Sequence, residues 1–227
     1  MDTIILELRI GVGGNDAKNL IKDMAAMYIK AARVNSFVVT NEHWKEGLII
    51  IWLSGSGVQK YFKNESGSHK FVRIPPTEKS GRVQTSTITV AILSGEKKEE
   101  FFLDKSQVTI NFTRSRGKGG QNVNKVESCV QLIHNPTGIV IRSEDSRDRE
   151  KNLVAAWERL SERLKSVFDK NVISETSKER NNQIGSGERS DSKRTYRYKD
   201  DLIIDHETGK SASLKQFMKG KLELLTK

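Results

Sequence analysis

The chain has 227 residues, and its 39 Lys and Arg against 29 Asp and Glu give a formal net charge of +10 at pH 7. This length supports one or two domains with a buried core, and the charge favours an acidic partner, most commonly nucleic acid. The single cysteine, Cys129, excludes an intramolecular disulfide framework, and the longest apolar run, Leu48–Leu53, is too short to span a bilayer. We therefore expect a soluble intracellular protein.

The first 93 residues predict alternating strands and helices. Period-two and β-branched patterns predict strands at Ile4–Ile10, Phe37–Thr40, Leu48–Leu53, His69–Ile74 and Thr85–Leu93. An apolar stripe at helical spacing predicts a helix over Ala17–Val34, and a shorter helix is expected at Val58–Asn64. Asn15 or Asp16 is expected to cap the longer helix.

A proline-containing loop separates the last two of these strands. Two of the three prolines, Pro75 and Pro76, lie in the segment Ile74–Ser86. Proline fixes φ and restricts the preceding residue, so the loop should be stiff and should present the hydroxyl of Thr77 at a defined place. From these residues alone, an ordinary turn between strands is the favoured interpretation.

The second half of the chain predicts a smaller β-rich unit followed by a helix and a return segment. Ser94–Gln107 is a polar connector. Strands are predicted at Val108–Phe112, Cys129–His134 and Gly138–Ile141, and a long helix at Asp148–Asp169, capped by Asp145 or Ser146. Lys170–Arg194 has the composition of a linker. Asp201–His206 predicts a strand, and Ser211 or Ser213 is expected to cap a final helix that ends near Leu225.

The segment Thr113–Lys125, TRSRGKGGQNVNK, predicts a flexible basic loop between two strands. Its glycines allow positive φ and close approach of backbone N–H groups to a ligand, and its cations favour a polyanion. Two generic interpretations stay open at this point, a solvated glycine-rich hairpin loop and a phosphate-cradling loop. The spacing of the P-loop motif is absent.

The longer string GKGGQNVNKVES, with HNPTGIVI after it, resembles the GGQ domain of class I peptide chain release factors. The segment ESGSHKFVRIPPTEKSGRVQTSTITVAIL resembles the codon-reading region of the same family, and IGSGERSDSKRTYRY resembles the segment in which the family's chain returns to that region. The resemblance implies an α+β fold, namely a codon-reading α/β superdomain with an inserted β-rich GGQ domain that carries a long helix.

The resemblance also implies a domain organisation. We expect the first part of the codon-recognition domain at residues 1–104, the GGQ domain at 105–171, and a switch segment with the return to the codon-recognition superdomain at 172–227. The family normally begins with a helical domain, which we expect this chain to lack because Met1 lies almost at the first strand.

By resemblance, Pro75-Pro76-Thr77 matches the P-x-T tripeptide of the family members that read UAA and UAG. Thr85 matches the threonine that contacts the third codon base. Val72 stands where this type usually has Gln, and Gln84 stands where both types have a stacking His. Because Val cannot bond the O6 of guanine, UAA should be favoured over UAG.

The resemblance assigns peptidyl-tRNA hydrolysis to Gly119, Gly120 and Gln121. The Gln121 backbone N–H would stabilise the developing oxyanion, and its side chain would position the nucleophile. The loop holds no side chain suited to general base work, and no Ser-His-Asp constellation or metal-ligand spacing occurs, so we expect a ribosome-dependent factor with no cofactor rather than a self-contained hydrolase. The expected rRNA contacts are Arg114, Arg116, Lys118, Lys125 and Arg147.

The partners implied are the ribosome, with its rRNA, an mRNA stop codon and peptidyl-tRNA, and a methyltransferase that modifies the Gln121 side chain. A recycling GTPase is left open because the helical domain that contacts it in the family is missing. No membrane partner is expected. The expected location is the cytoplasm, and an organellar or virus-encoded origin is left open.

Three functions follow from these observations. The leading hypothesis is stop-codon-dependent peptide release. The second is a ribosome-rescue hydrolase that acts without a stop codon. Gln84 and the missing domain favour this hypothesis, and the P-x-T tripeptide argues against it. The third is a non-catalytic ribosome-binding regulator, against which the intact Gly119-Gly120-Gln121 counts.

Overall fold

The computed structural model describes residues 2–95, 101–115, 126–185, 187–188 and 190–225. Two compact units emerge from the contacts between Cα atoms. Unit 1 combines the two ends of the chain, Met1–Lys97 and Thr176–Lys227, and unit 2 is the segment between them, Lys98–Glu175. The mixture of helices and sheets confirms the predicted α+β class.

Unit 1 is built on a sheet whose strands, in the described residues, follow the order β11-β10-β9-β4-β5-β1-β3-β2. All neighbouring strands are antiparallel except β4 and β9, which are parallel. The strands are β1 Thr3–Ile10, β2 Val38–Lys45, β3 Leu48–Ser54, β4 Gly67–Arg73, β5 Gln84–Ser94, β9 Arg194–Arg197, β10 Leu202–Asp205 and β11 Ser211–Ser213.

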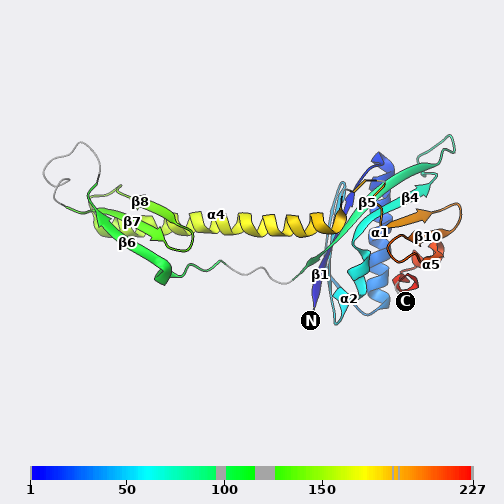
Figure 1. Ribbon diagram of the computed structural model, residues 1–227, viewed down its shortest axis with the longest axis horizontal. Helices are drawn as coiled ribbons and strands as arrows, with labels where there is room; N and C mark the ends of the chain where they lie inside the picture. Colours follow the sequence, from blue (N-terminus) through cyan, green and yellow to red (C-terminus); the bar gives the residue numbers. More distant parts are fainter. Residues whose placement is uncertain (1, 96–100, 116–125, 186, 189, 226–227) are drawn as a thin grey trace. The chain divides into compact units, whose positions relative to one another are not determined.

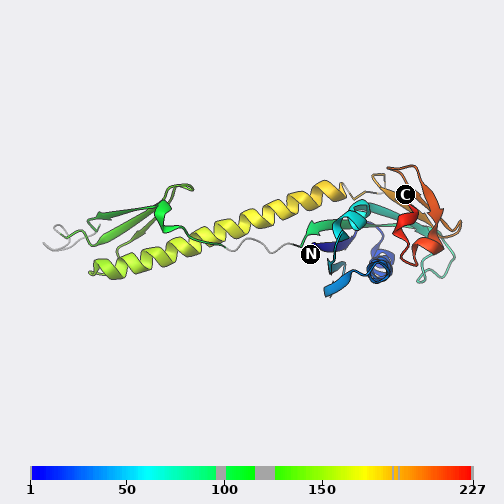
Figure 2. The ribbon, with the colours of Figure 1, turned by 90° about the horizontal axis from the view of Figure 1, so that it is seen from below.

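Helix α1, Gly14–Val34, packs on one face of this sheet (Figures 1 and 2). Alternate residues of a strand point to opposite faces, so every second residue of β1, β3 and β5 meets the apolar stripe of α1. The core includes Leu6, Leu8, Ile51, Val90, Leu20 and Met24. Two short helices, α2 Val58–Phe62 and the 3₁₀ helix Lys63–Glu65, precede β4. The predicted strands and helices of this segment are confirmed.

The start of α1 differs from the prediction. The residue before the helix is Gly13, at φ 135°, and no side chain caps the helix. Asn15 and Asp16 both lie inside the first turn. Asp16 is buried because its carboxylate binds Arg73 and Ser86 instead.

The C-terminal segment completes the sheet of unit 1. Ser213 caps α5, Leu214–Phe217, as predicted, because its hydroxyl accepts from the backbone N–H of Gln216 at 3.4 Å. The predicted helix to Leu225 is wrong. Gly220 has φ 92° and lies so close to α1 that a Cβ would be 2.9 Å from the backbone N of Ala31. That close approach ends the helix, and a 3₁₀ turn, Leu222–Leu224, follows it.

In unit 2 a sheet in the order β6-β7-β8 packs against helix α4, Arg149–Ile184. The strands are β6 Val108–Thr113, β7 Cys129–His134 and β8 Ile139–Ser143, and a 3₁₀ turn, Lys105–Gln107, precedes β6. Val130 and Leu132 of β7 meet Ala156, Leu160 and Leu164 of α4 in the core of this unit. Cys129 is buried, as a small apolar residue would be.

Helix α4 is longer than predicted. Its first turn is held by Asp148, whose carboxylate accepts from Glu150 N at 3.0 Å, and not by Asp145 or Ser146. The helix also continues through most of the segment that we expected to be a linker. Its last turns belong to unit 1, where Arg180 donates to Glu7 at 2.8 Å and Gln183 bonds both the N–H and the carbonyl of Ile92 at 2.7 Å. These polar contacts order a stretch that has few apolar residues.

Within the described ranges, no helix has the length and apolarity needed to cross a membrane.

Candidate functional site

The β4–β5 hairpin carries the residues expected to read the codon. Val72 lies directly opposite Thr85 in the register, and Arg73 lies opposite Gln84. The connecting loop begins with a turn in which Glu78 N donates to Pro75 O at 3.0 Å. Pro76 and Thr77 are the two central residues of that turn, so the fixed φ of Pro76 helps to define where Thr77 lies.

These residues do not all face one space. Val72 and Thr85 line a cavity of about 940 Å³, together with Arg197 and Lys199 from the return segment. Thr77 lines a separate hollow of about 560 Å³, with Lys18 and Lys22 of α1 and Trp44 of β2 among its neighbours. The structure therefore brings together the two residues expected at the third codon base and places Thr77 apart from them.

Gln84 is held by the loop itself. Its amide nitrogen donates to Glu78 Oε2 at 2.8 Å, and Ser80 N donates to the other carboxylate oxygen, Oε1, at 2.8 Å. These bonds hold the pKa of the Glu78 carboxyl below its usual value. The bond from the Ser80 backbone contributes most, and the bond from Gln84 comes second. Glu78 was not among the residues predicted from the sequence, since an acidic residue in a polar loop gives no signal of its partner.

The end of β4 is fixed to α1 by buried charges. The guanidinium of Arg73 donates to Asp16 Oδ1 from Nη2 at 2.7 Å and from Nε at 3.0 Å, and it contacts Asp23 at 3.3 Å. Ser86 Oγ on β5 donates to the second oxygen of Asp16 at 2.8 Å. Arg73 also lies over the ring of Tyr198, 5.3 Å from its centroid. This network fixes both strands at the point where the loop leaves them.

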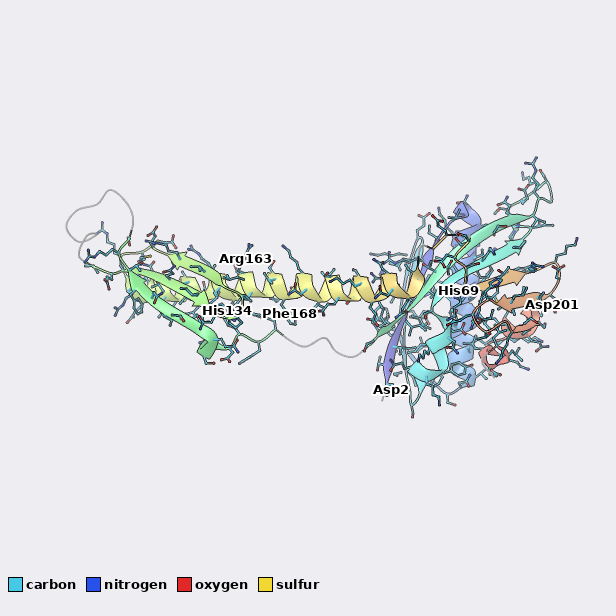
Figure 3. The ribbon with its side chains drawn as sticks, viewed as in Figure 1. Asp2, His69, His134, Arg163, Phe168 and Asp201 are labelled. Carbon is cyan, nitrogen blue, oxygen red and sulfur yellow. The ribbon has the colours of Figure 1, made fainter. Side chains whose placement is uncertain are left out.

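A second buried network lies where β4 meets the return strand β9. Arg194 is fully buried and donates to Glu65 at 2.5 Å and to Asp205 at 2.8 Å. His69, labelled in Figure 3 within the sheet of unit 1, bonds Tyr196 Oη at 2.8 Å and the carbonyl of Glu65 at 3.0 Å. Burial, and then the positive charge of Arg194, lower the pKa of His69 to about 3. The sequence does not indicate this pairing because Glu65 and Arg194 are 129 residues apart.

The GGQ residues Gly119, Gly120 and Gln121, and the cations Arg116, Lys118 and Lys125, lie outside the described residues. What the structure describes is the base of their loop. Thr113 at the end of β6 pairs with Cys129 at the start of β7, and the hydroxyls of Ser115 and Ser128 are 3.3 Å apart.

Asn152 of α4 ties this base to the helix. Its side chain is almost fully buried, at 1% exposed, and its amide nitrogen donates to the carbonyls of Ser128 and Ser146, each at 2.8 Å. Its amide oxygen accepts from Ser146 N at 2.8 Å. One neutral side chain therefore joins the C-terminal end of the loop, the β8–α4 connection and the helix.

Arginines surround the loop base. Arg114 and Arg147, two of the predicted rRNA contacts, are both exposed, and Arg114 O accepts from Arg142 Nη2 at 3.0 Å. Arg149 lies over the ring of Phe112, 4.7 Å from its centroid. Arg142 and Arg149 were not predicted from the sequence, although Arg149 stands in the same Arg-Asp-Arg string as Arg147. In the described part of unit 2, these arginines lie among carboxylates, and Arg142 is paired with Glu144 at 3.0 Å.

Among the residues that the structure describes, no three His, Cys, Asp or Glu side chains form a group that could hold a metal ion. Two of the histidines belong to different units. His69 is buried in unit 1, whereas His134, also labelled in Figure 3, ends strand β7 of unit 2 and bonds Thr137 Oγ1 at 2.8 Å.

Comparison with known proteins finds two family domains, one after the other along the chain. The PCRF domain matches residues 1–90, and the RF-1 domain matches residues 96–207. The second match extends beyond unit 2 into β9 and β10 of unit 1.

Several curated relatives carry the name peptide chain release factor 1. The protein of Chlamydia trachomatis serovar D is 35% identical over 235 residues, covering 99% of this chain and 65% of its own length. The protein of Hydrogenobaculum sp. is 38% identical over 209 residues, covering 89% of this chain and 59% of its own length. The chain thus spans less than two thirds of the length of these relatives.

A solved structure, RF2 of Thermus thermophilus, is similar with a TM-score of 0.56 and 27% identity, covering 99% of this chain and 66% of that one. The two domain matches follow one another along the chain, the relatives share one name, and the fold is similar. These findings agree with the resemblance of the sequence segments that contain Pro75–Thr77 and Gly119–Gln121. The chain belongs to the class I peptide chain release factor family.

Proposed function

We propose that this chain acts in translation termination. It would bind the ribosome, recognise a stop codon through the β4–β5 hairpin, and promote hydrolysis of the peptidyl-tRNA ester through Gly119-Gly120-Gln121. The observation that carries the proposal is that one chain holds both a P-x-T tripeptide, at the tip of a hairpin fixed by Arg73 and Asp16, and a GGQ tripeptide between two paired strands.

The codon-reading part of the proposal rests on the geometry of the hairpin. Thr77, in the turn closed by Pro75 and Glu78, would read the first two bases. Val72 and Thr85, facing one cavity, would meet the third base. A valine offers no hydrogen bond to guanine O6, so UAA would be favoured over UAG.

In the hydrolysis step the protein would supply a positioned donor and no general base. The Gln121 N–H would stabilise the oxyanion of the transition state, and the Gln121 side chain would restrict the nucleophile. A single donor of this kind is worth roughly 10²–10³ in rate. Exposed Arg114 and Arg147 near the loop base, with Arg116, Lys118 and Lys125 in the loop sequence, would bind rRNA phosphates.

The remaining assignments belong to the same proposal. Residues 1–104 and 172–227 would form the codon-recognition superdomain, with the switch segment at the start of the second range, and 105–171 the GGQ domain. A glutamine methyltransferase would modify Gln121, and the protein would work in the cytoplasm. It would depend on the ribosome for catalysis and need no cofactor.

Peptide release from purified ribosome complexes with a labelled peptidyl-tRNA tests this function. The templates are UAA, UAG, a sense codon and an empty codon site, each with wild type and Gln121→Ala. We expect release at UAA, weaker release at UAG, none on sense codons, and a loss of roughly 10²–10³ with Gln121→Ala. Equal release on all templates would instead support a rescue factor, and ribosome binding without release on any template would support a non-catalytic regulator.

A further inference from the structure

The contact between Glu78 and Gln84 has a consequence for codon choice that rests on the proposed function. We propose that Glu78 is a positioning residue, which fixes the orientation of the Gln84 amide so that Gln84 accepts adenine and rejects guanine at the second codon base. Gln84 stands where the family has histidine, so this device concerns the present chain.

The orientation of the amide follows from the chemistry of its partner. The two ends of a glutamine amide have nearly the same shape, but one end only donates and the other only accepts hydrogen bonds. An ionised carboxylate is an acceptor only, so the amide atom 2.8 Å from Glu78 Oε2 is the nitrogen. Ser80 N, which donates to the second carboxylate oxygen, fixes Glu78 in turn.

A held amide presents a defined pattern to a base. Once one N–H is bonded to Glu78, the amide retains its carbonyl oxygen and its second N–H. Adenine offers an amino donor beside a ring-nitrogen acceptor, which complements that pair. Guanine has an acceptor, O6, in place of the amino group, so its O6 would meet the amide carbonyl. An amide free to turn by 180° could instead point an N–H at O6, and the bond to Glu78 prevents that rotation.

The register indicates which base is read. Gln84 lies opposite Arg73, and Ser86 is two residues further along β5, so the three side chains share the face on which Arg73 and Ser86 reach Asp16 of α1. Val72 and Thr85, expected at the third base, belong to the opposite face. The first base of a stop codon is uracil. The purine that Gln84 would contact, together with Thr77, is therefore the second base, and the discrimination is between UAA and UGA.

The test is the ratio of the release rates at UGA and UAA, measured with the full chain on purified ribosome complexes. Glu78→Gln keeps the size of the side chain but can accept or donate, so the Gln84 amide can take either orientation. We expect the UGA-to-UAA ratio to rise about 3- to 10-fold, as for one hydrogen bond, with the UAG-to-UAA ratio unchanged. Glu42→Gln, the same charge change on exposed strand β2, should leave both ratios unchanged.

A double-mutant cycle separates positioning from a general effect on the loop. Gln84→Ala should lower release at UAA, because it removes the group that adenine bonds. Adding Glu78→Gln to Gln84→Ala should then have no further effect on the ratio. The inference is overturned if Glu78→Gln leaves the UGA-to-UAA ratio unchanged, or if its effect persists in the absence of Gln84. A wild type that releases equally on stop and sense codons would instead overturn the proposed function itself.

Discussion

Both units carry a loop at the end of an antiparallel hairpin, and they hold it by different chemistry. In unit 1, residues 74–83 leave strands that a buried guanidinium, Arg73, ties to Asp16. In unit 2, the loop base is held by a buried amide, Asn152, and by serine hydroxyls. Ionic contacts in a low dielectric fix a geometry strongly and are costly to break, whereas neutral hydrogen bonds contribute about 1 kcal/mol each.

This difference suits the two proposed tasks. Reading a codon needs side chains held in one arrangement, so that a wrong base meets an unpaired group. The charge networks of unit 1 provide that rigidity. In unit 2 the described part only has to hold the ends of the loop, because the proposed chemistry rests on the backbone of the glycine-rich tripeptide. Four changes would break or sharpen this contrast, from the largest expected effect to the smallest.

Replacing Arg194 should have the largest effect. Arg194→Leu removes the positive charge that pairs with the buried carboxylates of Glu65 and Asp205, so we expect a loss of about 3–5 kcal/mol in the free energy of unfolding of unit 1. Urea unfolding followed by the fluorescence of Trp44 and Trp52, in a Trp157→Phe background, measures it. The control is Arg197→Leu, an exposed residue on the same strand, which should change stability by less than about 0.5 kcal/mol. Equal effects of the two changes would refute the role of the buried network.

Removing the amide of unit 2 should cost less. Asn152→Ala removes the side chain that bonds the partly buried backbone groups of Ser128 and Ser146, so we expect a loss of about 2–3 kcal/mol in unit 2 and a slower release rate at every codon. Hydrogen exchange of the unit 2 amides measures the stability, and Asn171→Ala, exposed on the same helix, is the control. A change in codon preference, with the release rate unaltered, would contradict this assignment.

Acid should weaken unit 1 through His69. Its pKa falls from 6.5 to about 3 on folding. Between these two pH values the unfolded state binds a proton at His69 and the folded state does not. Stability is therefore complete above pH 6.5 and declines as the pH falls toward 3, with a loss of about 2 kcal/mol at pH 5. Unfolding free energies at pH 7.5 and pH 5 test this. His69→Gln should remove most of that difference, and His206→Gln, which is exposed, should not.

Changing Val72 should have the smallest effect. Val72→Gln places a donor within the cavity that Val72 shares with Thr85, where it can reach guanine O6. We expect the UAG-to-UAA release ratio to rise about 3- to 10-fold, with release at UGA unaltered. Val72→Met, which adds length without a donor, is the control. A rise with methionine as large as with glutamine would show that shape rather than hydrogen bonding sets the preference.

The sequence predicted the strands and helices well where apolar residues recur with a clear period, as in Ile4–Ile10 and Ala17–Val34. The prediction failed where polar contacts between distant residues determine the secondary structure. Lys170–Arg194 has few apolar residues, yet α4 continues to Ile184 and Arg180 and Gln183 bind the sheet of unit 1. The short strand β9 was missed because its order depends on β4, which lies more than 120 residues earlier.

The same reason limited the prediction of the site. Resemblance indicated Val72, Pro75–Thr77, Gln84 and Thr85, because short strings carry them. Their supports, Asp16, Glu78 and Asn152, are polar residues whose partners lie elsewhere in the fold, and Asp16 was even expected to be a helix cap. Hydrogen-bonded pairs distant in the sequence leave no local pattern, so only the structure reveals them.

The central claim is that residues 75–77 select the stop codon for a release reaction carried by the same chain. The most direct test is a chain with Pro75→Ser and Thr77→Phe, which makes the tripeptide match the UAA/UGA-reading type. We predict that release at UAA persists and that the UGA-to-UAA ratio rises, further when Glu78→Gln is added, with release at each codon still dependent on Gln121. If the double variant keeps the codon preference of the wild type, the tripeptide is only a stiff turn and the account of codon reading is wrong.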